Sequence, residues 1–287
     1  MNKISKKKYM LEDMNAIEVR KHLQHHNNNN KNKSIAFVLL GSCENHGDHL
    51  PFGSDFIFPV NLVQSILDNI INSQSESATA DAAPDEKPYD FIVLPAVPYG
   101  VSIHHIDYQM TISLRSCTMI SLIEDLLNCL ASNGIRRVVI LNGHDGNIAP
   151  AETAARNIKN RYPEMVIACL ESWWTLVGQK NKKIFEVWDG LGHGGEAETS
   201  AMLAVRPDLV DLSLAPAQTI PNLPGEDIRI YWKFDELTNT GSTGAPRSAT
   251  VKKGEEIVKI LTKVILDFLQ KMDSTDWKYG ISISNQK

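Results

Sequence analysis

Short apolar runs alternate with longer amphipathic stretches along the 287-residue chain. Four of the runs have strand length and almost no polar residues, as expected for strands buried on both faces. They are residues 34–40, 90–96, 136–141 and 165–170. Apolar residues three or four positions apart predict helices. These cover residues 56–71, 116–132, 148–160, 196–206 and 253–272. The alternation predicts an α/β fold, a three-layer sandwich in which helices flank a mostly parallel sheet.

Two segments lack the pattern of a packed core. Residues 1–33 contain a basic stretch and the low-complexity run HHNNNNKNK, so we expect a flexible N-terminal arm. Residues 73–88, SQSESATADAAPDEKP, combine serine, alanine and acidic residues, which predicts a surface insertion. The remaining chain, residues 34–287, is long enough to bury one substantial core and is expected to form a single domain.

The composition argues against several classes of function. A formal net charge of −5, without a basic stripe, argues against a nucleic-acid partner. Four cysteines without CxxC spacing indicate reduced thiols and not a disulfide framework. No apolar run approaches the roughly 18 residues of a membrane helix, and the N-terminus lacks the apolar region of a signal peptide. We therefore expect a cytoplasmic protein without a membrane partner.

Carboxylates and imidazoles gather in three loops near the ends of predicted strands. These are residues 41–55 (GSCENHGDHLPFGSD), 142–147 (NGHDGN) and 188–200 (WDGLGHGGEAETS). Parallel strands end at one edge of a sheet, so the loops can converge there. Taken alone, His46 is better explained as a hydrogen-bonded loop residue, and Glu196 as a favourable charge at a helix start. The three loops together favour a divalent metal site, because charged groups that are buried need partners.

Several motifs in order then suggest a family. The segments ENHGDHLPFGSD, NGHDGN and HGGEAETS resemble motifs of the creatininase family of metal-dependent amidohydrolases. Residues 99–114 and the later segment GSTGAPRSATVKKG also fit the family pattern. The resemblance runs from about residue 34 to about residue 269, apart from the predicted insertion. It implies the creatininase-like sandwich and a hydrolase that cuts a C–N amide bond.

The resemblance also implies a set of metal ligands. Glu44, His46, Asp55 and His144 match ligands of the family, with Asp55 bridging two divalent ions. Glu44 and His144 are then expected on one ion and His46 on the other. Creatininase has a further glutamate ligand two residues after the NGH histidine, where this chain has Gly146. Glu196 is expected to replace it. The ligand types suit Zn, Mn or Fe(II) without choosing among them.

The same resemblance assigns catalytic and substrate contacts. His193 is the candidate acid and base, since an imidazole titrates near neutral pH. Trp188, His105 and Asp145 are expected to contact the substrate, a small molecule with a linear or cyclic amide. In creatininase a tyrosine follows the NGH histidine, whereas Asp145 stands here, so we expect a wider or more polar pocket. Family members are closed oligomers, often hexamers, and we expect a homo-oligomer here too.

Two other functions stay open at this point. The first motif also resembles archaeal formamide hydrolases, which deformylate a ribosylaminopyrimidine phosphate in riboflavin and deazaflavin biosynthesis. Arg115, Arg247, Lys252 and Lys253 are the candidates for binding such a phosphate. The alternative from another class is a metal-binding relative that has kept the fold and lost turnover. The presence of every expected ligand type favours an enzyme.

Overall fold

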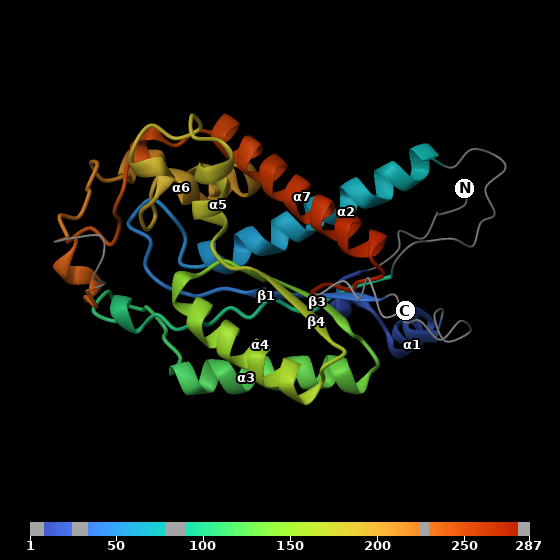
Figure 1. Ribbon diagram of the computed structural model, residues 1–287. Coiled ribbons are helices and arrows are strands. Elements are labelled where there is room, and N and C mark those ends of the chain that lie inside the picture. Colours follow the sequence, from blue (N-terminus) through green and yellow to red (C-terminus); the bar gives the residue numbers. More distant parts are fainter. Residues whose placement is uncertain (1–8, 25–33, 78–89, 224–229, 281–287) are drawn as a thin grey trace.

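The computed structural model describes residues 9–24, 34–77, 90–223 and 230–280. Four parallel strands form the central sheet in the order β2-β1-β3-β4 (Figure 1). They are β1 (Ile35–Leu40), β2 (Phe91–Val93), β3 (Arg137–Asn142) and β4 (Val166–Leu170). All four predicted strands are therefore confirmed, with the two central strands buried along their whole length.

Helices cover both faces of this sheet (Figure 1). On one face lie α3 (Ser116–Ser132) and α4 (Ile148–Arg161). On the other lie α2 (Ser54–Ser77), α5 (Trp173–Lys180), α6 (Glu196–Val205) and α7 (Val251–Ser274). The predicted three-layer α/β sandwich is confirmed. Among the described helices, none is both long and apolar enough to cross a membrane.

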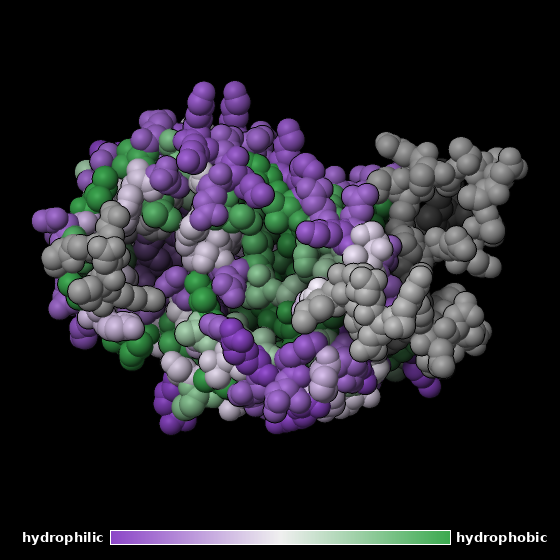
Figure 2. Space-filling model, viewed as in Figure 1, coloured by the Kyte–Doolittle hydropathy of each residue, from purple (hydrophilic) through white to green (hydrophobic). Residues whose placement is uncertain are grey.

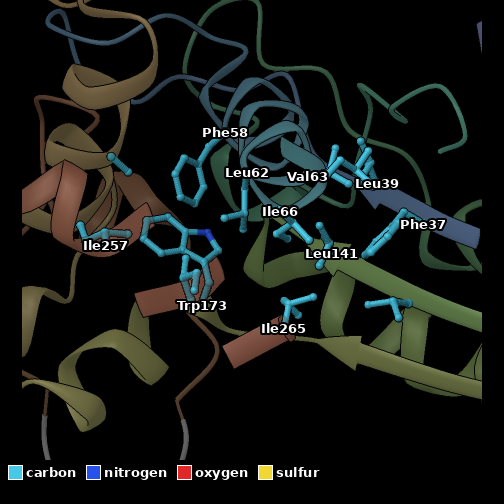
Figure 3. Close-up of a cluster of buried hydrophobic side chains, with 14 of the residues drawn as sticks. Phe37, Leu39, Phe58, Leu62, Val63, Ile66, Leu141, Trp173, Ile257 and Ile265 are labelled. Carbon is cyan, nitrogen blue, oxygen red and sulfur yellow. The ribbon is translucent and has the colours of Figure 1, made fainter. Parts of the chain in front are cut away.

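Alternate residues of β1 supply two separate cores. Phe37 and Leu39 pack with α2, α5 and α7, as Figure 3 shows for the cluster around Trp173. Ala36 and Val38 pack on the opposite face with α3 and α4. Side chains alternate across a strand, so an unbroken apolar run is what a sheet buried on both faces requires.

Two segments differ from the prediction. Residues 9–24 contain helix α1 (Ala16–Gln24), and Met10 forms a bridge to Val93 of β2, so this part of the predicted arm is folded. The rest of the arm lies outside the described residues. Helix α2 continues to Ser77, past the predicted start of the insertion, and residues 78–88 of that insertion also lie outside the described part.

Strand β4 is the edge of the sheet, and its side chains are only half-buried. An apolar band crosses the middle of the face shown in Figure 2, between hydrophilic regions. Figure 1, in the same view, shows β4 between α7 above and α4 below. This edge is therefore less protected than the rest of the sheet.

Candidate metal centre and active site

The first predicted loop folds back on itself at the carboxyl edge of the sheet. It leaves β1 after Leu40 and carries Glu44 and His46, both fully buried. The backbone N–H of Glu44 donates to the carbonyl of Phe52 (3.1 Å), which closes the loop. Asp55, the second residue of α2, thereby returns to the same buried place.

His144 reaches this place from β3. The two central strands pair in parallel up to Leu40 and Asn142, and the N–H of Gly143 donates to the Leu40 carbonyl (2.8 Å). A Cβ at position 143 would lie 1.9 Å from the backbone oxygen of Asp55. Only glycine permits this close approach of backbones, and the approach puts His144 beside Asp55.

Asp55 lies between two imidazoles. Its Oδ1 is 3.0 Å from His46 Nε2, and its Oδ2 is 3.2 Å from His144 Nδ1. His144 Nδ1 is also 3.3 Å from Glu44 Oε1. The structure thus brings together the four residues predicted from the first two loops, with Asp55 in the central position.

Each of these imidazoles uses its second nitrogen to hold its orientation. His46 Nδ1 donates to the carbonyl of Glu44 (3.0 Å), and His144 Nε2 donates to the carbonyl of Val101 (3.0 Å). A carbonyl only accepts, so when each ring is in its neutral, metal-binding form the remaining nitrogen presents a lone pair toward Asp55. Backbone bonds of this kind commonly orient metal-binding histidines.

The buried carboxylates of the cluster require positive charge close to them. Glu44 Oε1 and Asp55 Oδ2 are buried and have no hydrogen-bond partner, which is costly for charged oxygens. Burial disfavours a charged His46, but the carboxylate of Asp55 outweighs that effect and raises the pKa of His46 to about 10. The residues present therefore fit divalent metal ions, which supply positive charge and accept imidazole and carboxylate ligands.

The third carboxylate beside this cluster is Glu198, whereas the predicted ligand Glu196 lies apart from it. Glu198 lies with His46 and His193, close enough for the three side chains to share an ion. Burial and the nearby Asp55 raise the pKa of Glu198 to about 7, although His46 opposes the shift. Glu196 is fully buried elsewhere, where its carboxylate pairs with Lys253 Nζ (2.5 Å).

Helix geometry explains why Glu198, and not Glu196, lies beside the cluster. Residues two apart in an α-helix point about 200° from each other, so Glu196 and Glu198 cannot face the same site. Gly146 also leaves no room for a carboxylate, because a Cβ there would lie 2.0 Å from the Val101 oxygen. The motif HGGEAETS contains both glutamates, and only the direction in which α6 begins selects between them.

His193 stands beside the four clustered residues. Its ring stacks on His46 (centroids 4.2 Å apart), and its Nδ1 lies 3.6 Å from Glu44 Oε1. Nε2 donates to the carbonyl of Asn45 (2.5 Å), which leaves the Nδ1 lone pair free. Burial, reinforced by the nearby His46, lowers the pKa of His193 to about 3. The ring is therefore neutral near pH 7.

A cavity of about 200 Å³ opens onto the cluster. All three predicted substrate contacts, Trp188, His105 and Asp145, line it. The structure adds three aromatic side chains that the sequence did not reveal: Trp174, Trp232 and Phe234. Phe234 packs against both His105 and His193, with ring centroids 4.2 and 4.9 Å apart. The cavity therefore has an acidic and imidazole floor and aromatic walls.

No lysine or arginine lines this cavity in the part of the chain that the structure describes. Two of the four basic residues predicted to bind a phosphate are engaged elsewhere. Lys253 Nζ contacts Glu196 and Glu186, and Arg247 Nε donates to the carbonyl of Ala215 (2.9 Å). The described walls thus offer a phosphate no cationic partner.

A parallel α/β sandwich with a carboxylate–imidazole cluster at the carboxyl ends of its strands has the features of a metal-binding site. A family model described as creatininase, creatinine amidohydrolase, matches residues 20–269. The chain therefore belongs to the creatininase family of amidohydrolases.

The matched relatives are hydrolases with different substrates. Creatinine amidohydrolase of Pseudomonas putida is 24% identical over 254 residues, covering 83% of this chain and 89% of the relative. The mycofactocin precursor peptide peptidase of Mycolicibacterium smegmatis is 26% identical over 230 residues, covering 78% and 79%. A crystal structure of creatininase superposes with a TM-score of 0.75 at 23% identity, covering 93% of this chain and 98% of that one. Other solved neighbours include Mn and Zn–Zn forms of creatininase.

Proposed function

We propose that this protein is a two-metal hydrolase that cleaves a C–N amide bond in a small, non-peptide substrate. The observation that carries the proposal is the position of Asp55, whose two oxygens face His46 and His144. A buried carboxylate whose two oxygens face different imidazoles can bridge two ions, and the buried Glu44 Oε1 beside it has no hydrogen-bond partner.

Two overlapping groups of side chains would hold the ions. Glu44, Asp55 and His144 form one group. His46 and Glu198, with His193 close to both, form the other, which shares Asp55 through its contact with His46. When bound, two divalent ions acidify water toward neutral pH and polarise an amide carbonyl. The three carboxylates offset most of their charge, and Zn, Mn and Fe(II) all fit these ligand types.

His193 is proposed to carry the proton of the reaction. Its neutral ring presents Nδ1 beside Glu44, while Nε2 is fixed on the Asn45 carbonyl. Nδ1 can accept a proton as the nucleophile forms. The same nitrogen, once protonated, can pass that proton to the departing nitrogen of the amide.

The residues that line the cavity indicate which kind of substrate it can bind. Trp174, Trp188 and Trp232 offer flat apolar surfaces, and Asp145 adds a carboxylate. Aromatic walls without a cation favour a flat, neutral or cationic amide and disfavour a phosphorylated one. The formamide hydrolase alternative is therefore the weaker candidate, and creatinine itself is one member of the favoured class.

The test combines metal content with a panel of amides. Protein purified without chelator is analysed for metals and then incubated with creatinine, other cyclic amides, formamides, a formamidopyrimidine phosphate and short peptides. We expect about two ions per chain and release of an amine from a neutral amide. Hydrolysis of peptides alone would contradict the non-peptide substrate. A folded protein that stays empty after reconstitution with Zn, Mn or Fe(II) would contradict the catalytic proposal.

We also propose that the chain forms a homo-oligomer in the cytoplasm. Support comes from the half-buried edge strand β4, whose apolar side chains Ile167 and Cys169 pack incompletely against the core. Light scattering at micromolar concentration measures the mass. A monomer at these concentrations would contradict the proposal.

A further inference from the structure

Glu196 is a fully buried carboxylate that does not belong to the metal cluster. It accepts hydrogen bonds from the backbone N–H groups of Glu186 (3.1 Å) and Val187 (3.3 Å). Lys253 Nζ supplies the charge partner at 2.5 Å. These contacts hold residues 186–187, which themselves lie outside the helices and strands.

Lys253 joins this segment to the rest of the fold. Besides Glu196, its Nζ donates to the Glu186 carboxylate and to the Ser248 carbonyl, both at 2.8 Å. Three parts of the chain meet here: residues 186–187, the first turn of α6 and the first turn of α7. Removal of one partner of such a pair leaves the other charge buried and uncompensated, so the pair ties these three parts together.

The segment held in this way leads directly to Trp188, the aromatic wall of the cavity. Trp188 and Asp189 have φ angles of 51° and 50°, in the left-handed region that non-glycine residues seldom adopt. Such a conformation persists only where the surroundings enforce it. The Glu196 contacts enforce it from the N-terminal side.

Contact with α5 enforces the left-handed conformation of Trp188 and Asp189 from the C-terminal side. The carbonyl of Asp189 lies so close to this helix that a Cβ at Gly178 would be 2.8 Å from it. Trp188 itself is 41% exposed, so packing of its own ring does not fix its position. The backbone on its two sides must do so.

We propose that Glu196 and Lys253 are positioning residues that hold Trp188 against the cavity and thereby set how tightly substrate binds. The consequence for binding depends on the proposed function of the cavity as the substrate site, whereas the effect on Trp188 does not. Neither residue touches the metal cluster, so loss of the ion pair should leave the ions and the chemical step in place.

The first test observes Trp188 directly and needs no substrate. The chain has five tryptophans, so 5-fluorotryptophan labelling should give five ¹⁹F NMR signals, and W188F identifies that of Trp188. In K253M and E196Q we expect the Trp188 signal to shift or broaden, while the signals of buried Trp173 and Trp277 stay in place. K253R, which keeps the charge, should retain more of the native signal.

The matched control is Lys252, the exposed neighbour of Lys253 in α7. K252M removes the same charge from the same turn and should leave all five signals unchanged. An unchanged Trp188 signal in K253M would overturn the proposal. Loss of all five signals in K253M would overturn it too, because the ion pair would then support the whole fold and not this wall.

The second test uses whichever amide the wild-type protein hydrolyses. We expect K253M and E196Q to raise KM about tenfold, with kcat within roughly threefold of wild type, as for a lost binding contact. Metal content should equal that of wild type. A fall in kcat with KM unchanged would overturn the substrate-binding role. If no amide is hydrolysed, the proposed function fails and the NMR result still decides the positioning of Trp188.

Discussion

Two carboxylates in the first turn of α6, the half-buried Glu198 and the buried Glu196, lie two residues apart and have different surroundings. Glu198 lies among His46, His193 and other carboxylates, without a lysine or arginine in its cluster. Glu196 is bonded to Lys253 and to two backbone N–H groups. A buried carboxylate with a complete set of protein partners has no need of a metal ion, whereas one surrounded by like charges does. The partners of a glutamate therefore reveal its role better than its place in a motif.

The largest effect is expected from Asp55, the central carboxylate of the cluster and the proposed bridge between two ions. D55N keeps the size of the side chain but removes the charge between His46 and His144. We expect the metal content to fall from about two ions per chain to one or fewer and the activity to fall at least about a thousandfold. Elemental analysis and amide turnover measure the two effects. Unchanged metal content would show that Asp55 does not bridge.

Replacement of His193 separates a proton carrier from a metal ligand. H193N removes the Nδ1 lone pair beside Glu44, and we expect kcat to fall about 10²- to 10⁴-fold. The metal content should stay at the wild-type value, because His46 and Glu198 remain. Loss of an ion in H193N would instead assign His193 to the ligand set.

The matched variants E198Q and E196Q test directly whether the two glutamates differ in metal binding. E198Q should weaken metal binding by at least about 10- to 100-fold, the loss seen when even an outer partner of a metal site is removed. E196Q should keep the full metal content. Isothermal titration of the metal into chelator-treated protein measures both affinities. Equal losses in the two variants would mean that the two glutamates do not differ in role.

The smallest effect is expected at Trp188, the cavity residue that Glu196 is proposed to position. W188A removes an aromatic surface of the cavity without touching the cluster, and we expect KM to rise about tenfold while kcat changes little. Initial rates over a range of substrate concentrations give both constants. W188F, which retains a flat ring, should lie between W188A and wild type. A KM unchanged in W188A would exclude Trp188 from substrate binding.

Much of the fold and half of the site were predictable from local patterns. The four apolar runs became the four strands, and the loops after β1 and β3 brought Glu44, His46, Asp55 and His144 together as expected. The folded helix α1 and the helix α5 were missed. Helix α5 is only eight residues long, too short for a reliable helical period.

The aromatic walls were missed for a different reason. Trp232 and Phe234 come from a long irregular region after α6, and nothing in its sequence specifies which segment it will cover. Trp174 belongs to an aromatic pair after β4, and the sequence of such a pair is equally consistent with a place in the hydrophobic core. In fact Trp173 joins the core while Trp174 lines the cavity.

The amino-acid sequence alone was enough to predict the order of strands and helices, the edge of the sheet where the candidate site lies, and the family. Hydrophobic period and strand-end position are local properties, so they can be recognised along the chain. Only the tertiary structure decided that Glu198 faces the cluster and Glu196 faces Lys253. That choice depends on the direction in which α6 starts and on a lysine 57 residues away in the sequence, and both are consequences of how the helices pack.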